Sequence, residues 1–235
     1  MASGDVVSRE VTYPGRACKL KAFVVEPAAD GARAAVIVVQ EWWGLNDHIR
    51  DVARRFAREG YFAIAPDLYS RQGHKVATEP NQAAELMSGL KQEDGIEDLQ
   101  TTVEWLRAQK QTQSARLGIT GFCMGGSYAL RLPCETREIS AAAPFYGEIP
   151  PDEKLKNLGC PILYVYGEND GWIQRKDVDR VAAALKKFDQ EGEVVIYPGC
   201  SHGFFNDTRP DVYRPTEAKD AWTRTLKLFA ANLKR

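Results

Sequence analysis

Short apolar runs alternate with longer amphipathic stretches along most of the chain. Branched and aromatic residues fill the runs, and glycine or proline often borders them. Such runs are typical of strands that are buried on both faces of a parallel sheet. The pattern is shared by residues 34–39, 61–66, 116–120, 139–147, 160–167 and 193–199.

The stretches between these runs carry apolar residues at helical spacing. In the first stretch Ile49, Val52 and Phe56 fall on one face, and Asn46 or Asp47 is placed to cap the helix start. Further helices are predicted over residues 82–92, 94–109, 176–189 and 216–233.

The alternation of strands and helices predicts an α/β fold with a mostly parallel central sheet and helices on both faces. Residues 18–27 resemble a further strand that ends in a proline, and we expect it in an antiparallel edge. No repeat, low-complexity tract or linker interrupts the pattern. Residues 1–235 are therefore predicted to form a single domain.

The charge and composition of the chain argue against some classes of binding partner. The net charge is −1 and the two signs are mixed, which argues against nucleic acid or an anionic membrane as a partner. The N-terminal segment lacks the apolar core of a secretory signal, and the longest apolar run is too short to span a bilayer. We expect a soluble cytoplasmic protein that is a monomer or a small homo-oligomer.

The 5 cysteines are an odd number, and no CxxC pair occurs. This pattern is unlike a disulfide framework or a structural zinc site.

Cys123 stands where a predicted strand meets a predicted helix. The sequence Gly121-Phe122-Cys123-Met124-Gly125 has the G-x-S-x-G form of a nucleophile elbow, with cysteine in place of serine. Small neighbours permit the sharp turn, and the N-terminus of a helix favours a thiolate. The alternatives are a buried packing cysteine and a phosphate-binding turn.

A nucleophilic thiol needs a base, and the chain has 3 histidines. His48 falls within a predicted helix and His74 in a polar loop, where either fits a solvated surface residue. His202 follows the last predicted strand, which is the position of the base in the order nucleophile, acid, histidine. We therefore predict His202 as the base.

The acid is expected after a strand between Cys123 and His202. Glu168 and Asp170 both follow the 160–167 run, and Asp170 is preferred because it lies further from the strand end. The alternative for Asp170 is an ordinary Asn-Asp-Gly turn. Asp207 is a weaker candidate because it comes after the histidine.

Glu41 follows the first central strand, so it is expected on the same rim as Cys123. The alternative is a capping or loop carboxylate. The loop after this strand normally gives one N–H to the oxyanion hole, so the backbone N–H groups of Trp42 and Met124 are predicted as the donors.

Four segments together resemble the dienelactone hydrolase family: residues 40–71, GFCMGG, YGENDG and GCSHGF. The resemblance runs in order from about residue 10 to the C-terminus. It implies an α/β-hydrolase fold without metal or cofactor and a triad of Cys123, His202 and Asp170. It also implies that the resting thiol turns toward Glu41 until substrate binds.

The reaction that the resemblance implies is hydrolysis of an enol-lactone through an acyl-enzyme, as in a carboxymethylenebutenolidase that converts dienelactone to maleylacetate. Family members that act on dienelactone hold its carboxylate with arginines, but Asn206 occupies one such position here, and Asn81 and Gln82 lie near the other. Arg71 and Arg209 are candidate substitutes. An uncharged lactone or a simple ester is equally consistent.

The connection between residues 146 and 160 is too short to hold a cap domain, so a small, open cleft is expected. Aromatic residues near strand ends are candidates for its walls, with core packing as the alternative for each: Trp42, Trp43, Tyr146, Trp172 and Phe204.

Two other functions compete with hydrolysis. A thiol redox protein would use Cys123 with a resolving partner, for which Cys200 is the candidate. A non-catalytic binding module on the same fold would not depend on Cys123. The order Glu41, Cys123, Asp170, His202 favours the hydrolase.

Overall fold

The computed structural model describes residues 5–112 and 114–234. Residues 1–4, part of the segment in which no secretory signal is predicted, lie outside the described residues. The chain divides after Gly118 into two compact units, and each is described by itself. That residues 1–235 form a single domain stays a prediction.

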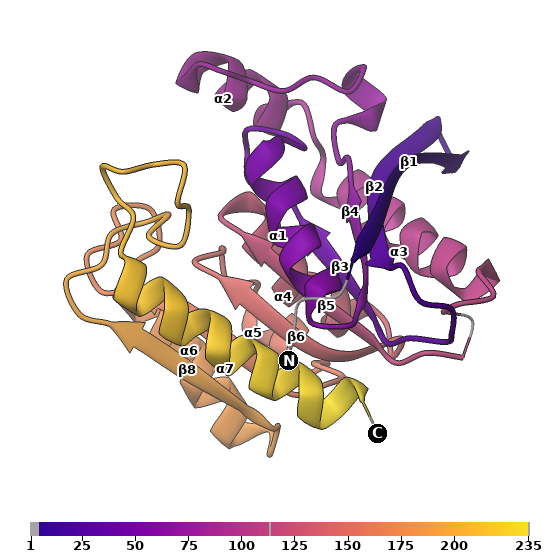
Figure 1. Ribbon diagram of the computed structural model, residues 1–235. Helices are drawn as coiled ribbons and strands as arrows, with labels where there is room; N and C mark the ends of the chain where they lie inside the picture. Colours follow the sequence, from indigo (N-terminus) through magenta and orange to yellow (C-terminus); the bar gives the residue numbers. More distant parts are fainter. Residues whose placement is uncertain (1–4, 113, 235) are drawn as a thin grey trace. The chain divides into compact units, whose positions relative to one another are not determined.

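The first unit contains a four-stranded arrangement in the order β1-β2-β4-β3 (Figure 1). β1 pairs with β2 and β2 with β4 in antiparallel fashion, whereas β3 and β4 are parallel. The strands are β1 (Val6–Pro14), β2 (Lys19–Pro27), β3 (Ala35–Val39) and β4 (Phe62–Pro66). The antiparallel edge predicted at residues 18–27 is therefore present, but β1, which the sequence pattern did not reveal, lies outside it.

The helices of the first unit are α1 (Asp47–Arg58), α2 (Pro80–Ser88) and α3 (Gln92–Ala108), with a short 3₁₀ turn η1 (Ser70–Gln72). Asn46 caps α1, since its side-chain oxygen accepts the Ile49 N–H at 3.2 Å. α1 and α3 lie on opposite faces of the strands (Figure 1). The helix predicted after Asn46 and the helices predicted over residues 82–92 and 94–109 are therefore confirmed as α1, α2 and α3, with their ends shifted.

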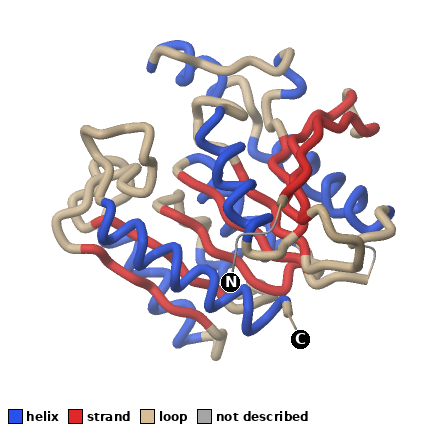
Figure 2. Tube along the Cα trace, in the orientation of Figure 1, coloured by secondary structure: helices blue, strands red, loops and turns tan. Residues whose placement is uncertain are grey.

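The second unit holds the strands in the order β5-β6-β7-β8, and β6, β7 and β8 are mutually parallel. Figure 2 distinguishes these strands, in red, from the helices that pack on them, in blue. The strands are β5 (Leu117–Phe122), which begins in the last residues of the first unit, β6 (Ile139–Phe145), β7 (Ile162–Gly167) and β8 (Gly192–Tyr197). The helices are α4 (Met124–Glu135), α5 (Asp152–Leu155), α6 (Arg175–Lys187) and α7 (Pro215–Leu233). α7 covers one face, and α4 and α6 cover the other (Figure 1).

The core of each unit is built on strands without an exposed residue. Every residue of β3, β4, β5 and β7 is buried, which explains why these strands are continuous apolar runs in the sequence. In the connection from β6 to β7 the four-residue α5 is the one helix, so there is no cap domain.

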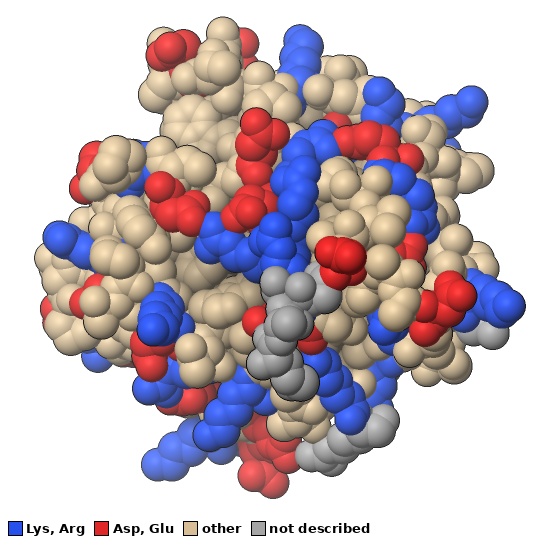
Figure 3. Space-filling model, in the orientation of Figure 1, with Lys and Arg blue, Asp and Glu red and all other residues tan. Residues whose placement is uncertain are grey.

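Charges of both signs lie side by side across the face shown in Figure 3. No described helix is long and apolar enough to cross a membrane.

Candidate active site

Cys123 occupies the sharp turn between β5 and α4. Its φ of 56° and ψ of −120° place a non-glycine residue in a rarely populated conformation. The Cys123 N–H donates to the Phe145 carbonyl at 3.1 Å, and its carbonyl accepts the Ser127 N–H at 3.2 Å. Strain of this kind persists only where the surroundings fix it, which is typical of a nucleophile elbow.

The glycines around the turn allow α4 to approach the end of β6. A Cβ atom on Gly126 would lie 2.2 Å from the Phe145 carbonyl oxygen. A Cβ on Gly147 would lie 2.1 Å from the Gly126 carbonyl carbon. No side chain fits at either position, so the elbow depends on glycine here.

Asp170 and His202 come together after β7 and β8. Nδ1 of His202 lies 2.8 Å from Oδ2 of Asp170, whose side chain is fully buried. The other carboxylate oxygen accepts the backbone N–H groups of Trp172 at 2.8 Å and Ile173 at 2.9 Å. Three hydrogen bonds therefore compensate the burial of the Asp170 charge and fix its orientation.

The His202 ring lies between two aromatic side chains. Its centroid is 4.9 Å from that of Tyr146 and 5.5 Å from that of Trp172, which stacks at an interplanar angle of 23°. Nε2 is buried and has no hydrogen-bond partner of ordinary geometry among the described residues. Cys123 is nevertheless close enough to act on the ring electrostatically.

Opposing effects set the pKa of His202. Burial lowers the pKa, but the hydrogen bond to Asp170 and the interaction with the Cys123 sulfur outweigh it and raise the pKa from 6.5 to about 10. The surroundings thus favour the imidazolium form. A ring that is held by a carboxylate at Nδ1 and interacts with a thiol can take a proton from that thiol and return it to a leaving group.

In the first unit, Glu41 begins a tight turn two residues after the end of β3 and is buried. The Gly44 N–H donates to the Glu41 carbonyl at 3.2 Å, the Tyr69 hydroxyl to the Trp42 carbonyl at 2.8 Å, and the Ala77 N–H to the Trp43 carbonyl at 2.8 Å. The turn is therefore rigid. Because the peptide is trans, the Trp42 N–H points away from the Glu41 carbonyl.

A second aspartate–histidine pair lies near this turn, in the same unit. Nδ1 of His74 is 3.0 Å from Oδ2 of Asp67, and Oδ1 of Asp67 accepts the Tyr69 N–H at 2.9 Å. Burial raises the pKa of Asp67. The sequence interpretation missed this pair. His48 lies in a helix as predicted, but the suggestion that it fits a solvated surface residue is wrong, because His48 is buried in α1.

Arg71, a candidate for binding a substrate carboxylate, is held by three acidic side chains of α3. Its guanidinium lies 3.2 Å from Asp94, 2.7 Å from Glu97 and 2.8 Å from Asp98. The local positive charge is therefore largely compensated.

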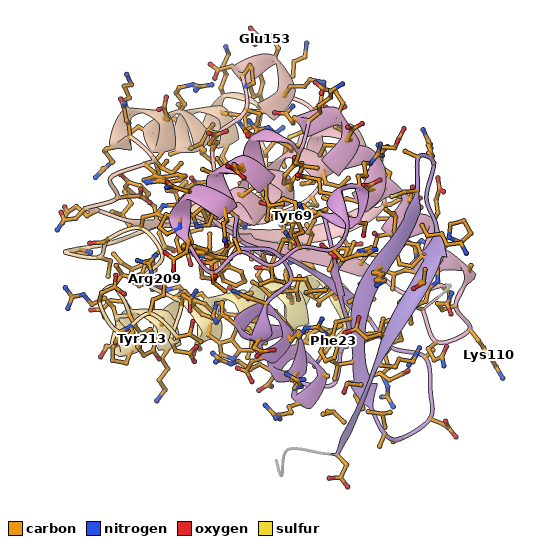
Figure 4. The ribbon with its side chains drawn as sticks, turned by 90° about the horizontal axis from the view of Figure 1, so that it is seen from above. Phe23, Tyr69, Lys110, Glu153, Arg209 and Tyr213 are labelled. Atoms are coloured by element: carbon orange, nitrogen blue, oxygen red, sulfur yellow. The ribbon has the colours of Figure 1, made fainter. Side chains whose placement is uncertain are left out.

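Arg209, the other candidate, lies in the segment between β8 and α7 (Figure 4) and pairs with Asp211 at 2.8 Å. Asn206 is buried, and its side-chain oxygen accepts the Thr208 N–H at 3.0 Å. Asn206 therefore shapes this turn.

The predicted aromatic wall residues differ in exposure. Tyr146 and Phe204 are fully buried with ring centroids 5.8 Å apart. Trp172 is 53% exposed. In the first unit, Trp43 is partly exposed and packs edge-on against Trp42.

All five cysteines are free thiols. Burial raises the pKa of Cys200 to about 11, and that of Cys134 and Cys160 to about 12. Thiols of this kind react slowly, which weakens the case for Cys200 as a resolving partner. The described residues contain no group of side chains suited to hold a metal ion.

Comparisons with known proteins identify the family of the chain. A model of the dienelactone hydrolase family matches residues 20–233. A Salmonella typhimurium protein named "Putative carboxymethylenebutenolidase" is 36% identical, over 97% of this chain and 88% of its own length.

Among solved structures, one titled "Putative Dienelactone Hydrolase" from Klebsiella pneumoniae has a TM-score of 0.89 and 34% identity, covering 97% of this chain and 99% of its own. A dienelactone hydrolase from Anabaena variabilis shares the fold, with a TM-score of 0.73, 21% identity and coverage of 97% and 99%.

These likenesses first define the class: the protein is an α/β hydrolase with a mostly parallel sheet and no cap domain, which confirms the predicted fold class. Within that class, the chain belongs to the dienelactone hydrolase family and is an ester or lactone hydrolase. The catalytic roles of individual residues stay predictions.

Proposed function

We propose that the protein hydrolyses small lactones or carboxylic esters with Cys123 as the nucleophile. The observation that carries the proposal is the arrangement within the second unit. A strained cysteine at a strand-to-helix turn interacts with a histidine whose other nitrogen is held by a buried aspartate. Nucleophile, base and acid of this kind define a catalytic triad by geometry and role.

In the acylation step, His202 takes the thiol proton and the sulfur attacks the substrate carbonyl carbon. The tetrahedral intermediate collapses as the C–O bond breaks, and the imidazolium returns the proton to the leaving oxygen. A lactone ring opens at this point, whereas an ester releases its alcohol. Water then attacks the thioester with His202 as base, which frees the acid and restores the thiol.

Two further roles rest on the sequence. The N–H groups of Trp42 and Met124 are proposed to stabilise the oxyanion, an effect worth about 3 kcal/mol per donor in comparable sites. The carboxylate of Glu41 is proposed to keep the resting thiol neutral and to help take its proton when substrate binds.

The proposed substrate class follows from the ion pairs of the two candidate arginines, because an arginine that is held by carboxylates is less able to bind an anionic substrate. Relatives carry the name carboxymethylenebutenolidase, which implies an anionic enol-lactone. Arg71 is compensated by three carboxylates, and Arg209 is paired with Asp211. These pairings favour uncharged lactones and simple esters over dienelactone.

A reactive thiol is preserved in a reducing compartment, so we also propose a cytoplasmic location. A monomer or a small homo-oligomer is proposed as the assembly state, without nucleic acid or membrane partners.

Hydrolysis of p-nitrophenyl acetate and of a small neutral enol-lactone tests the proposal. Wild type should cleave both, and Cys123→Ala should lose the activity, whereas Cys134→Ala should retain it because Cys134 is a buried thiol outside the triad. Equal rates for wild type and Cys123→Ala would overturn the cysteine mechanism. Faster cleavage of an anionic dienelactone than of its neutral analogue would overturn the preference for uncharged substrates.

A further inference from the structure

The backbone on both sides of Trp172 is held by the catalytic machinery of the second unit. Its N–H donates to Asp170 at 2.8 Å, and the next residue, Ile173, donates its N–H to the same carboxylate oxygen at 2.9 Å. The Ile173 carbonyl accepts the hydroxyl of Tyr166, which is buried, at 2.9 Å. The position of the indole is therefore tied to that of Asp170.

The indole lies over one face of the His202 ring. The two rings are nearly parallel, at 23°, with centroids 5.5 Å apart. Tyr146 contacts the imidazole from another direction, at 4.9 Å and 58°. Trp172 is 53% exposed and Tyr146 is fully buried, so of these two rings the indole is the one that meets solvent.

An aromatic face attracts a cation that lies on it, and indole does so most strongly among the natural side chains. In the proposed reaction, His202 becomes an imidazolium each time it takes a proton from the thiol or from water. The stacked indole therefore stabilises the ring more strongly when the ring carries its positive charge. It also covers the ring beside the Asp170 hydrogen bond, where water would compete for the carboxylate.

We propose that Trp172 is a positioning residue for the base: its indole stabilises the charged form of His202 and shields the His202–Asp170 hydrogen bond from water. This inference rests on the proposed function of the site. It goes beyond a role as a substrate wall, because it assigns the effect of Trp172 to the proton-transfer step.

The two roles differ in what they change. A wall residue contacts substrate in the ground state, so its loss raises KM. A residue that stabilises the imidazolium acts when charge develops, so its loss lowers kcat and changes the pH profile while KM stays nearly constant.

The direct test is an NMR titration of His202 in a Cys123→Ser background, which removes the thiol as a second titrating group on the ring. In this background the Asp170 carboxylate and the Tyr146 phenol still face His202. Trp172→Leu keeps an apolar cover without a π face and should lower the pKa of His202 by up to about one unit. Trp172→Phe should keep most of the effect.

Kinetics with intact Cys123 complete the test. Trp172→Leu should lower kcat for p-nitrophenyl acetate about tenfold with little change in KM, and Trp172→Phe should stay close to wild type. Trp105→Leu is the control, because Trp105 stacks on Tyr13 in the first unit and its loss should leave the His202 titration unchanged.

An unchanged His202 titration in Trp172→Leu would overturn the inference, as would a change confined to KM. The titration does not depend on turnover. If Cys123→Ala kept full esterase activity, the cysteine mechanism would fail, while the titration would still decide whether Trp172 stabilises the imidazolium.

Discussion

The two units contain aspartate–histidine pairs of the same local design, Asp170 with His202 and Asp67 with His74. In each pair Nδ1 of the histidine meets one carboxylate oxygen, at 2.8 Å and 3.0 Å respectively. In each pair the other oxygen accepts the backbone N–H two residues along, at 2.8 Å and 2.9 Å. Both aspartates follow shortly after a buried parallel strand.

The pairs differ in what surrounds the histidine ring. His202 is stacked by Trp172 and interacts with the thiol of Cys123. The side chain of His74 is 29% exposed, and its backbone has a φ of 62° within a loop. An aspartate therefore orients a histidine equally well in a covered site and in an exposed loop. The group that faces the histidine ring decides whether the pair suits catalysis.

The pair in the first unit has a structural role instead. The segment from Asp67 to Ala77 supplies the Tyr69 hydroxyl and the Ala77 N–H to the carbonyls of Trp42 and Trp43. Asp67 fixes this segment by accepting the Tyr69 N–H as well as pairing with His74.

Replacing the aspartate of each pair with asparagine should give the largest difference in kcat between the two pairs. Asp170→Asn should lower kcat by about 10⁴-fold, because the histidine loses the partner that sets its tautomer. Asp67→Asn should leave kcat within a few-fold of wild type. Its cost should be a loss of about 1–3 kcal/mol in the free energy of unfolding, since the buried Asp67 carboxylate accepts hydrogen bonds from Tyr69 and His74. Steady-state kinetics and urea unfolding measure the two effects, and equal losses of kcat would remove the distinction.

The pH dependence of stability should also carry the signature of His202. Because its folded-state pKa is raised from 6.5 to about 10, His202 stabilises the fold fully below pH 6.5. That contribution should be lost as the pH rises toward 10. The difference in free energy of unfolding between wild type and His202→Gln should therefore shrink over this interval. A difference that is constant with pH would show that the pKa is not raised.

The smallest expected effect tests the structural role of the first region. Tyr69→Phe removes only the hydrogen bond to the Trp42 carbonyl and should lower the free energy of unfolding by about 1 kcal/mol. Tyr213→Phe is a matched control, because Tyr213 lies in the second unit, outside the proposed triad. A larger loss for Tyr213→Phe than for Tyr69→Phe would contradict the role assigned to Tyr69.

The sequence predicted the architecture well where strands are fully buried. The apolar runs at residues 34–39 and 160–167 correspond to β3 and β7. Strands that are buried on both faces have no polar positions, so they are easy to recognise in the sequence. β1 was missed because most of its residues are exposed, so its sequence lacks an apolar signal.

The proposed catalytic pair was predictable in part because strand ends limit where functional groups converge. Position along the chain singled out Asp170 and His202. It did not reveal that Asp67 binds His74, since a loop histidine and a nearby aspartate carry no periodic pattern. It also did not reveal that Arg71 is committed to Asp98 and its neighbours on α3, since a charged side chain on a helix is usually solvated.

The most direct test of the account is to identify the residue that carries the acyl group during turnover. Brief reaction with p-nitrophenyl acetate at acidic pH, followed by denaturation and peptide mass spectrometry, should find an acetyl thioester on the peptide that contains Cys123. This adduct should form in wild type and should be absent in Cys123→Ser. Turnover without an adduct on Cys123, or with the acetyl group on Cys200, would contradict it.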